Sequence, residues 1–281
     1  MYLTAEQLKG KIKNEAKSIH ANAPTLLRLY MMERFLERVS LSPYRERFVV
    51  KGGILVTALV GVALRSTMDI DASLKNFNLS EKDAAEMIRE IIHIPLKDDV
   101  NFTVKDVIPV MDQMEYPGIR ITLEASLEKL IVPLKIDIST GDAITPSAVE
   151  YRYKLLLEDR NITLWSYNTE TVLAEKIQTI LARGILNTRM RDFYDIRVLW
   201  NLYGNKISAD ILQNAFSATC RKRKTLFTQI ETETIAAKLE TDSHMFSLWE
   251  TYRKKYPYAE TITYEDTITS LKELLNALKL R

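Results

Sequence analysis

The fold is decided by two neighbouring stretches of the chain, residues 48–53 (FVVKGG) and residues 65–74 (RSTMDIDASL). In the first stretch a short β-type run meets a Gly-Gly break, and apolar residues at helical spacing follow it. In the second stretch apolar and polar residues alternate from Asp69 to Leu74, which is typical of a strand with one polar face. The two stretches therefore predict a strand, a tight turn into a helix, and a second strand that presents Asp69 and Asp71 on the same face.

More strand patterns follow these two stretches. Alternation recurs over residues 101–110, 119–125 and 131–139, with a turn at Tyr116-Pro117-Gly118. This spacing predicts an antiparallel meander attached to the Asp69 strand. Two weaker patterns, at residues 151–157 and 162–166, predict an extension of the sheet.

Helical patterns occupy the two ends of the chain. Thr4 begins a capping box before a helical region that reaches about residue 40, and Ser80 caps a helix that runs to about Ile92. From Thr169, whose side chain could cap the next helix, the pattern is helical to the C-terminus. We therefore expect an α+β protein with a mixed sheet flanked by helices in residues 1–168 and a helical bundle in residues 169–281.

Composition excludes several classes of protein. The chain has 281 residues, 46% of them hydrophobic, and one cysteine, so it can form a core but no internal disulfide. Its 39 Lys and Arg against 37 Asp and Glu leave a net charge of +2, so any nucleic-acid contact must be local. The longest apolar stretch, residues 53–64, is shorter than the roughly 20 residues that span a bilayer, and the start resembles no signal peptide. We expect a cytoplasmic protein with no membrane partner.

Carboxylates are the candidate metal ligands, because one cysteine and three scattered histidines form no zinc-like cluster. Asp69 and Asp71 on one strand face repel each other unless a cation lies between them, and Mg²⁺ takes such oxygen ligands. Asp137, on the polar side of a later strand, would add the third carboxylate of a two-metal phosphoryl-transfer site. Gly52 and Gly53 would let a phosphate approach the amides at a helix N-terminus. The alternative is solvated aspartates on an edge strand and an ordinary tight turn.

These features together resemble the nucleotidyltransferase fold of the DNA-polymerase-β type. The fuller resemblance is to the AbiEii/AbiGii toxin nucleotidyltransferases of bacterial toxin–antitoxin and phage-defence loci. It covers about residues 46–200 and rests on five motifs in the expected order: FVVKGG at 48–53, RSTMDID at 65–71, LKID at 134–137, LAEKI at 173–177 and RMRDFYDI at 189–196. The spacing between Gly53 and Asp69 exceeds that of the commonest Gly-Ser form of the superfamily, although it suits this branch.

The resemblance implies an enzyme that uses Mg²⁺ or Mn²⁺ to transfer a nucleotide from a nucleoside triphosphate to an acceptor hydroxyl, releasing pyrophosphate. Asp69, Asp71 and Asp137 would hold the metals, and with Lys176 and Asp192 they would form the catalytic set. The helical domain would complete the active-site cleft. The residues that would hold the triphosphate lie in or near the motifs: Lys51, Gly52, Gly53, Arg65, Thr67 and Lys176.

The resemblance also implies a toxin that halts growth, with RNA as the acceptor, such as a tRNA 3′ end, and a cognate antitoxin as partner. A second hypothesis is a nucleotide-binding or RNA-binding regulatory protein on the same fold without turnover. A third, weaker one is a kinase-like or nucleotide-cyclising transferase. The residues themselves do not identify the base or the acceptor.

Three features of the helical half have two interpretations each. Lys176 is either a phosphate ligand or a solvated lysine on an amphipathic helix. Asp192 and Asp195 can share a helix face, and of the two we favour Asp192 as the one in the cleft. Residues 221–224 (RKRK) are either a solvated helix end or a contact for RNA phosphates.

Overall fold

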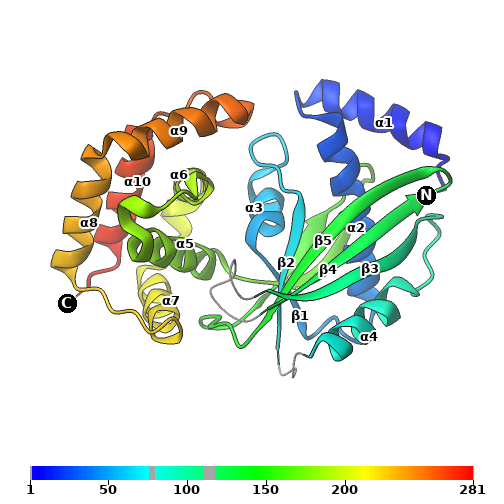
Figure 1. Cartoon of the computed structure of the whole chain (residues 1–281), viewed down its shortest axis with the longest axis horizontal. Coiled ribbons are helices and arrows are strands. Elements are labelled where there is room, and N and C mark those ends of the chain that lie inside the picture. The colour runs from blue at the N-terminus through cyan, green and yellow to red at the C-terminus, as the bar shows by residue number, and fades with distance from the viewer. Residues whose placement is uncertain (1, 76–79, 111–117, 281) are drawn as a thin grey trace. The chain divides into compact units, whose positions relative to one another are not determined.

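A computed structural model describes residues 2–75, 80–110 and 118–280 of the chain (Figure 1). Its contacts divide the chain into two compact units, which we call unit 1 (Met1–Asp142 and Ala148–Ser166) and unit 2 (Ala143–Ser147 and Tyr167–Arg281). Unit 1 contains the sheet, and unit 2 is helical. The prediction of an α+β protein, with a mixed sheet followed by a helical bundle, is confirmed.

The sheet of unit 1 has seven described strands in the order β3-β4-β5-β2-β1-β7-β6. It is mixed, because β2 pairs parallel to β5 and β1 pairs parallel to β7, whereas the remaining neighbours are antiparallel. The predicted meander, β3 to β5, lies next to β2 as expected, and the predicted extension is β7 and β6 beyond β1. Residues 116 and 117 of the predicted turn lie outside the described part of the chain. The strands are β1 Phe48–Lys51, β2 Asp69–Leu74, β3 Asn101–Val110, β4 Gly118–Leu127, β5 Leu130–Thr140, β6 Val149–Lys154 and β7 Asn161–Ser166.

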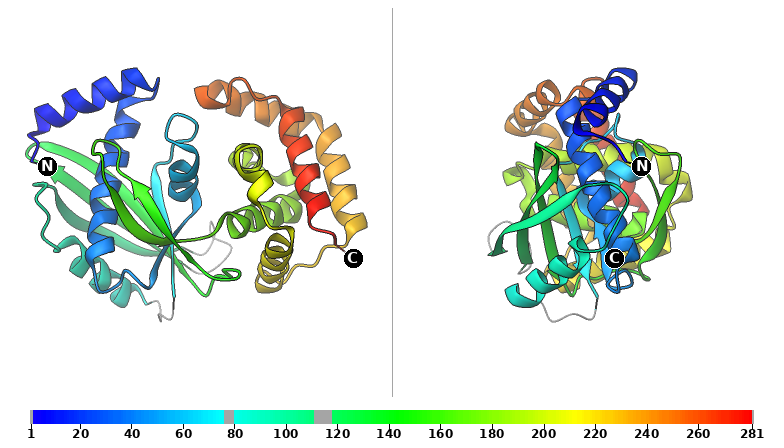
Figure 2. Two further views of the ribbon diagram at one scale, coloured as in Figure 1. Left: turned by 180° about the vertical axis from the view of Figure 1, so that it is seen from behind. Right: turned by 90° about the vertical axis from the view of Figure 1, so that its right-hand side faces the viewer.

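Helix α2 runs across one face of this sheet (Figure 2), where it contacts β5 and β7, and α1 packs against α2. Both predicted caps are confirmed. The Thr4 side chain and Gln7 form a capping box at α1, and the Ser80 hydroxyl accepts from the Asp83 amide at α4. The helices of unit 1 are α1 Ala5–Ser18, α2 Ala23–Leu41, α3 Gly52–Val60 and α4 Glu81–Ile92.

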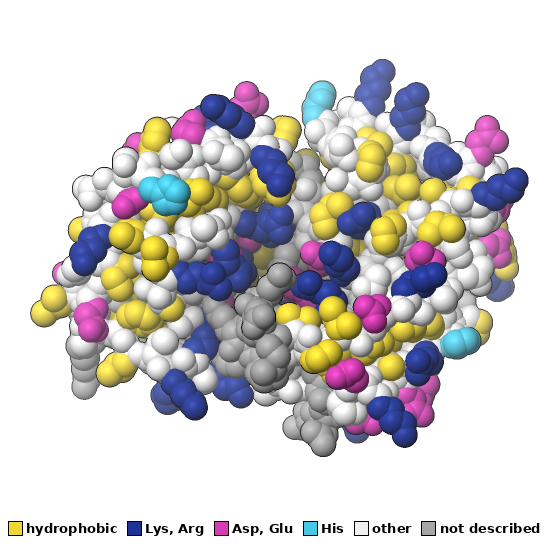
Figure 3. All heavy atoms as spheres, viewed as in Figure 1, with side chains coloured by type: hydrophobic (Ala, Val, Ile, Leu, Met, Phe, Trp, Pro, Cys, Tyr) yellow, Lys and Arg dark blue, Asp and Glu magenta, His cyan; other side chains and the backbone are white. Residues whose placement is uncertain are grey.

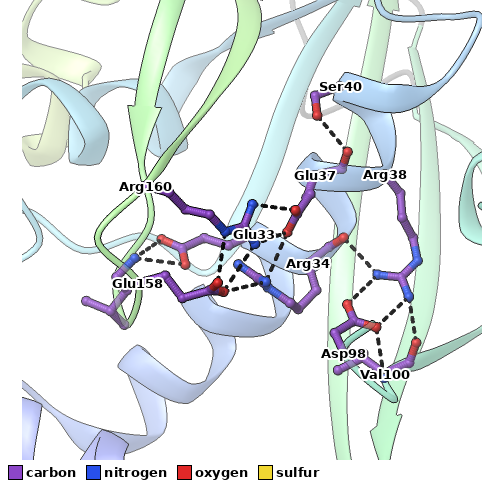
Figure 4. Close-up of polar contacts among 10 residues, drawn as sticks. Glu33, Arg34, Glu37, Arg38, Ser40, Asp98, Val100, Glu158 and Arg160 are labelled. Carbon is purple, nitrogen blue, oxygen red and sulfur yellow. Dashed lines mark hydrogen bonds and ion pairs between the residues drawn. The ribbon is translucent and has the colours of Figure 1, made fainter. Parts of the chain in front are cut away.

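A network of ion pairs, buried on the α2 side, connects α2 to the loop between β6 and β7 (Figure 4). Arg34 pairs with Glu158 at 2.9 Å, and Arg160 donates to both carboxylate oxygens of Glu37 at 2.5 and 2.9 Å. The Arg34 and Glu37 side chains on α2 are only 2% and 9% exposed, so their charges would be costly to bury without partners. The network therefore fixes the position of α2 against the loop.

Glu33 also lies on α2, but its hydrogen-bond donor is a backbone amide of the same loop rather than a cation. Its two carboxylate oxygens each accept the amide of Leu156 at 3.1 Å, and its side chain is almost fully buried. Burial raises the pKa of Glu33 from 4.5 to about 8, although the Leu156 amide, Arg34 and the Tyr153 hydroxyl all act to lower it. At neutral pH the folded protein therefore retains a proton on Glu33 that the unfolded chain releases.

We expect Glu33→Gln to flatten the dependence of stability on pH. A folded pKa above the unfolded one stabilises the native state fully below the unfolded pKa, and this stabilisation is lost as the pH rises through about 8. Glutamine keeps an oxygen acceptor for Leu156 and carries no charge, so the variant should gain in melting temperature relative to the wild type as the pH rises. Thermal melts from about pH 5 to about pH 9 measure this difference. Parallel curves for the two proteins would contradict the raised pKa.

Unit 2 consists of six α-helices joined by short turns within the described residues. Helix α5 packs against α6 and α7, and α10 packs against α6 and α8. The predicted cap of α5 was wrong by one residue. Asn168 is the N-cap, and its side-chain oxygen accepts the Thr171 amide at 2.7 Å. The helices are α5 Thr169–Arg183, α6 Met190–Tyr203, α7 Ala209–Lys222, α8 Gln229–Thr241, α9 Ser243–Lys255 and α10 Tyr264–Ala277.

No helix in the described ranges combines the length and the apolar character that crossing a membrane requires.

Candidate active site

Four charged side chains form a row across four adjacent strands of unit 1. Strand register places Lys51 opposite Asp71, Asp71 opposite Asp137, and Asp137 opposite Arg120. Register partners on neighbouring strands present their side chains to the same face of a sheet. The structure thus brings together two of the three predicted carboxylates and gives each a cation on its outer side. Asp69 precedes Asp71 by two residues, so it lies on the same face.

The Gly-Gly turn is built against Asp71. The Gly53 amide donates to Asp71 Oδ2 at 3.1 Å. Partial burial raises the pKa of Asp71, and the nearby Asp137 and Asp69 carboxylates add to this rise, whereas the Gly53 amide and the Lys51 ammonium oppose it. Asp71 is therefore a carboxylate whose negative charge is costly in this site, and a bound cation would remove that cost.

Gly52 has the backbone conformation and the close contact that only glycine tolerates. Its φ is +60°, and a Cβ added to it would lie 2.6 Å from Cγ of Asp71. The second glycine is as tightly enclosed, because a Cβ on Gly53 would lie 2.6 Å from Oγ1 of Thr67 and 3.4 Å from a guanidinium nitrogen of Arg65. The predicted Gly-Gly motif is thus a point where backbone and functional side chains approach each other closely.

Gly52→Ala should destabilise the protein by about 1–3 kcal/mol, because backbone strain and displacement of Asp71 add together. Two other glycines serve as controls. Gly61 has a φ of +90° but open space around it, so Gly61→Ala measures strain alone. Gly10 is inside α1 with nothing near its Cβ position, so Gly10→Ala should stabilise by up to about 1 kcal/mol. Urea unfolding of the three variants gives the comparison, and a Gly52→Ala cost no larger than that of Gly61→Ala would show that Asp71 is not displaced.

Arg65 and Thr67, both predicted to bind the triphosphate, are buried beside this turn with exposures of 1% and 4%. The Arg65 guanidinium donates to the carbonyl of Ser66, and Thr67 Oγ1 donates to the carbonyl of Asp69 at 3.3 Å. Both side chains therefore lie at the start of β2 and next to Gly53. Their role in nucleotide binding stays a prediction.

Asp137 is held by a bidentate ion pair. Arg120 Nε and Nη2 donate to its two carboxylate oxygens, each at 2.8 Å. Within the described residues no group of three His, Cys, Asp or Glu side chains is arranged to hold a metal ion. Asp69 and Asp71 nevertheless have the oxygen chemistry and the mutual repulsion that suit a hard cation. The donor set therefore fits Mg²⁺ through these two residues, with Asp137 engaged by Arg120.

Lys51 reaches the end of β5. Its ammonium donates to Ser139 Oγ at 2.8 Å and to Asp142 Oδ2 at 2.5 Å, and Asp142 has no exposed side-chain surface. These contacts hold Lys51 beside the carboxylates, where its charge opposes the rise in the pKa of Asp71 that burial causes. The role of Lys51 in holding a triphosphate stays a prediction.

Sequence reasoning missed three residues of this site, Arg120, Ser139 and Asp142. Alternation around Arg120 did place it on the polar face of β4, but its partner depends on strand register, which the pattern does not show. Ser139 lies two residues after Asp137 on β5. The alternation that places Asp137 on the polar face of this strand therefore places Ser139 there too. Asp142 follows the strand in a loop and carries no recognisable signal.

The second group of predicted residues lies within unit 2, between α5 and α6. The Lys176 ammonium contacts Asp192 Oδ1 at 2.8 Å and Asp195 Oδ2 at 2.7 Å, while Arg189 Nε lies 2.9 Å from Asp192 Oδ2. The side chain of Lys176 is 12% exposed, and those of Asp192 and Asp195 are 5% and 0% exposed. The interpretation of Lys176 as a solvated lysine is therefore wrong.

Electrostatics within this group favour the charged forms. Burial acts to lower the pKa of Lys176, but Asp192 and Asp195 outweigh it and raise the pKa. Burial likewise acts to raise the pKa of Asp192, and Lys176 and Arg189 outweigh it and lower the pKa. The helices α5 and α6 are thus joined by a buried cluster of charges, and the catalytic roles of Lys176 and Asp192 stay predictions.

The basic run at residues 221–224 divides into two kinds of side chain. Arg223 contacts α5, where its Nη1 donates to Gln178 Oε1 at 2.5 Å and to Thr179 Oγ1 at 2.9 Å. Its side chain is only 9% exposed. Arg221, Lys222 and Lys224 are exposed. Any RNA contact from this run must therefore come from these three, because Arg223 is structural.

The Gly-Gly turn, the carboxylates on β2 and β5 and the mixed sheet are the features that the resemblance to nucleotidyltransferases predicted. A family described as "Nucleotidyl transferase AbiEii toxin, Type IV TA system" matches residues 34–276. The chain belongs to this family.

Solved structures support the fold. A candidate nucleotidyltransferase from H. pylori has a TM-score of 0.52 at 15% sequence identity, over 90% of this chain and 94% of that one. JHP933 from Helicobacter pylori has a TM-score of 0.50 at 15% identity, over 90% and 91% of the two chains. A comparison with curated protein sequences finds no match.

Proposed function

We propose that the protein is a Mg²⁺-dependent nucleotidyltransferase toxin that transfers a nucleotide from a nucleoside triphosphate to a hydroxyl group of RNA, such as a tRNA 3′ end. The observation that supports this most directly is the row formed by Lys51, Asp71, Asp137 and Arg120, with the Gly-Gly turn against Asp71. Family membership also implies an antitoxin partner.

The proposed chemistry is positioning and charge neutralisation. Asp69 and Asp71 would hold the metal, which when bound supplies positive charge to the oxygens of the reacting phosphate. Gly52 and Gly53 add no side chains of their own to the first turn of α3, so a phosphate could accept from its amides once it replaced Asp71 at the Gly53 amide. Arg120 orients Asp137, and Lys51 adds a cation at the opposite side of the carboxylates.

A second candidate function is nucleotide or RNA binding without turnover. One observation favours it, because Arg120 already engages both oxygens of Asp137 and would have to release one for a third metal ligand. Under this alternative Asp137 is a structural partner of Arg120 alone.

Incubation of the protein with each of the four α-labelled nucleoside triphosphates, Mg²⁺ and total RNA distinguishes these functions. Label that becomes covalently attached to RNA, with release of pyrophosphate, is the expected result. Label retained by the protein only until denaturation supports binding without turnover. Label covalently attached to protein, or recovered as a free cyclic nucleotide, contradicts transfer to RNA.

A further inference from the structure

A cavity of about 540 Å³ lies in unit 2 between the first turn of α6 and the C-terminal half of α9. Its size is within the range of sites that bind small organic groups. Its walls carry three cations, Arg189, Arg191 and Lys255, and two aromatic side chains, Tyr252 and Tyr256. This combination of cations and rings is the chemistry of surfaces that bind nucleotides.

The electrostatics of the cavity favour an anion. Asp192 is the single acidic residue among its lining side chains, and Asp192 is already paired with Lys176 and Arg189. The positive end of the α6 dipole also points to this place. Arg189, the N-cap of α6, makes no side-chain capping bond to the first turn. Figure 3 shows Lys and Arg side chains on the face of unit 2 that is seen in that view.

The Tyr256 ring on the cavity wall is held in place by contacts with other aromatic side chains. Trp249 stacks on Tyr252 with centroids 5.4 Å apart, Tyr252 lies 4.7 Å from Tyr256, and Tyr256 stacks on Tyr258 at 5.4 Å. Trp249 and Tyr252 are buried, whereas Tyr256 is half-buried. The inner rings therefore fix the orientation of a ring that solvent can still reach.

Two cations lie over that ring. Lys255 Nζ lies 5.5 Å from the Tyr256 ring centroid, and the guanidinium carbon of Arg191 lies 5.8 Å from it. Arg191 Nη2 also donates to the Tyr256 hydroxyl at 3.4 Å. A base that stacks on this ring would displace these two long side chains from its face, and their charges would then lie within reach of its own phosphate and that of its neighbour.

We propose that this cavity binds one unpaired nucleotide of a single-stranded RNA, with the base against Tyr256 and the flanking phosphates at Arg191 and Lys255. The choice of RNA rests on the proposed function, to which the inference adds a place for the acceptor strand. A paired base does not meet this description, because its faces are covered by its neighbours in the duplex.

The test is equilibrium binding of a short fluorescent single-stranded RNA, without metal or triphosphate, followed by anisotropy over a range of salt concentrations. Tyr256→Leu should raise the dissociation constant by about 5- to 150-fold, the range for loss of one stacked base. Tyr256→Phe keeps the ring and should bind nearly as the wild type. The double variant Arg191→Gln, Lys255→Gln should reduce the slope of log K against log salt by about 1.4, at about 0.7 per phosphate contact on a single strand.

One control variant matches a change in charge next to the cavity, and a second pair of changes asks whether the basic run contributes to binding. Lys254 is an exposed neighbour of Lys255 and does not line the cavity, so Lys254→Gln should leave the RNA affinity close to that of the wild type. The pair Arg221→Gln, Lys224→Gln removes two exposed charges from the end of α7 and tests the basic run there. Thermal melts of all variants separate loss of binding from loss of the aromatic packing.

The outcomes separate the inference from the proposed function. Weaker single-strand binding by Tyr256→Leu, with unchanged binding of duplex RNA and of free nucleoside triphosphate, supports the inference even if no transfer is detected. Equal binding by the wild type and Tyr256→Leu overturns it, even if the wild type transfers nucleotides to RNA. A loss confined to triphosphate binding also overturns it, and so does an unchanged salt slope in the Arg191 and Lys255 variant.

Discussion

Lys176→Met should lower the free energy of unfolding by about 3–5 kcal/mol, the typical cost of removing one partner from a buried ion pair. Lys176 contacts two carboxylates that are nearly or fully buried. Without the ammonium, Asp192 and Asp195 would face each other as like charges between α5 and α6. Methionine has similar length and no charge, so the loss measures electrostatics rather than a packing cavity. Urea unfolding at neutral pH provides the measurement.

Two further variants make this result specific. In the triple variant Lys176→Met, Asp192→Asn, Asp195→Asn much of the lost stability should return, because an uncharged replacement of a buried ionic group is often neutral. Lys272 pairs with Glu240 at the surface, with side chains 42% and 50% exposed. Lys272→Met should therefore cost less than about 1 kcal/mol. Similar losses for Lys176→Met and Lys272→Met would refute the buried cluster.

The same cluster shows what a single sequence can and cannot predict about helices. The spacing of apolar residues correctly predicted α5 and α6, because burial of one face repeats every three to four residues. It did not predict that Lys176 is buried, because that depends on which helix packs against it. The error at the N-cap of α5 is of another kind. Asn168 and Thr169 are adjacent residues that both cap helices well, and the chain geometry decides between them.

For the sheet, too, some features were predictable from the sequence and others were not. Alternation with period two correctly placed Asp69 and Asp71 on one face, and the order of the strand patterns predicted the meander. Register is a relation between two strands, and a shift by one residue would move every side chain to the other face. For this reason Arg120 was not identified as the partner of Asp137. The Gly-Gly break was found from its composition, whereas its contact with Asp71 became visible only in three dimensions.

The largest expected effect on activity comes from Asp71→Asn, which should reduce nucleotide transfer by about a thousandfold or more. Under the proposed function Asp71 is a metal ligand, and its loss removes several kcal/mol of transition-state stabilisation. Each 1.36 kcal/mol corresponds to about tenfold in rate. Asparagine keeps an oxygen that can accept the Gly53 amide, so the turn should persist. The comparison is the rate of label incorporation into RNA at saturating Mg²⁺ for the two proteins.

Stability gives a second, independent result for the same variant. The pKa of Asp71 is raised in the folded protein, so its contribution is favourable at low pH and is lost as the pH rises through the folded pKa. Asp71→Asn should therefore melt at the same or a higher temperature than the wild type at neutral pH without divalent cations. Addition of Mg²⁺ should raise the melting temperature of the wild type but not of the variant, because a ligand that binds only the native state stabilises it. Near-normal transfer by Asp71→Asn, or an equal shift of both proteins with Mg²⁺, would remove Asp71 from the metal site.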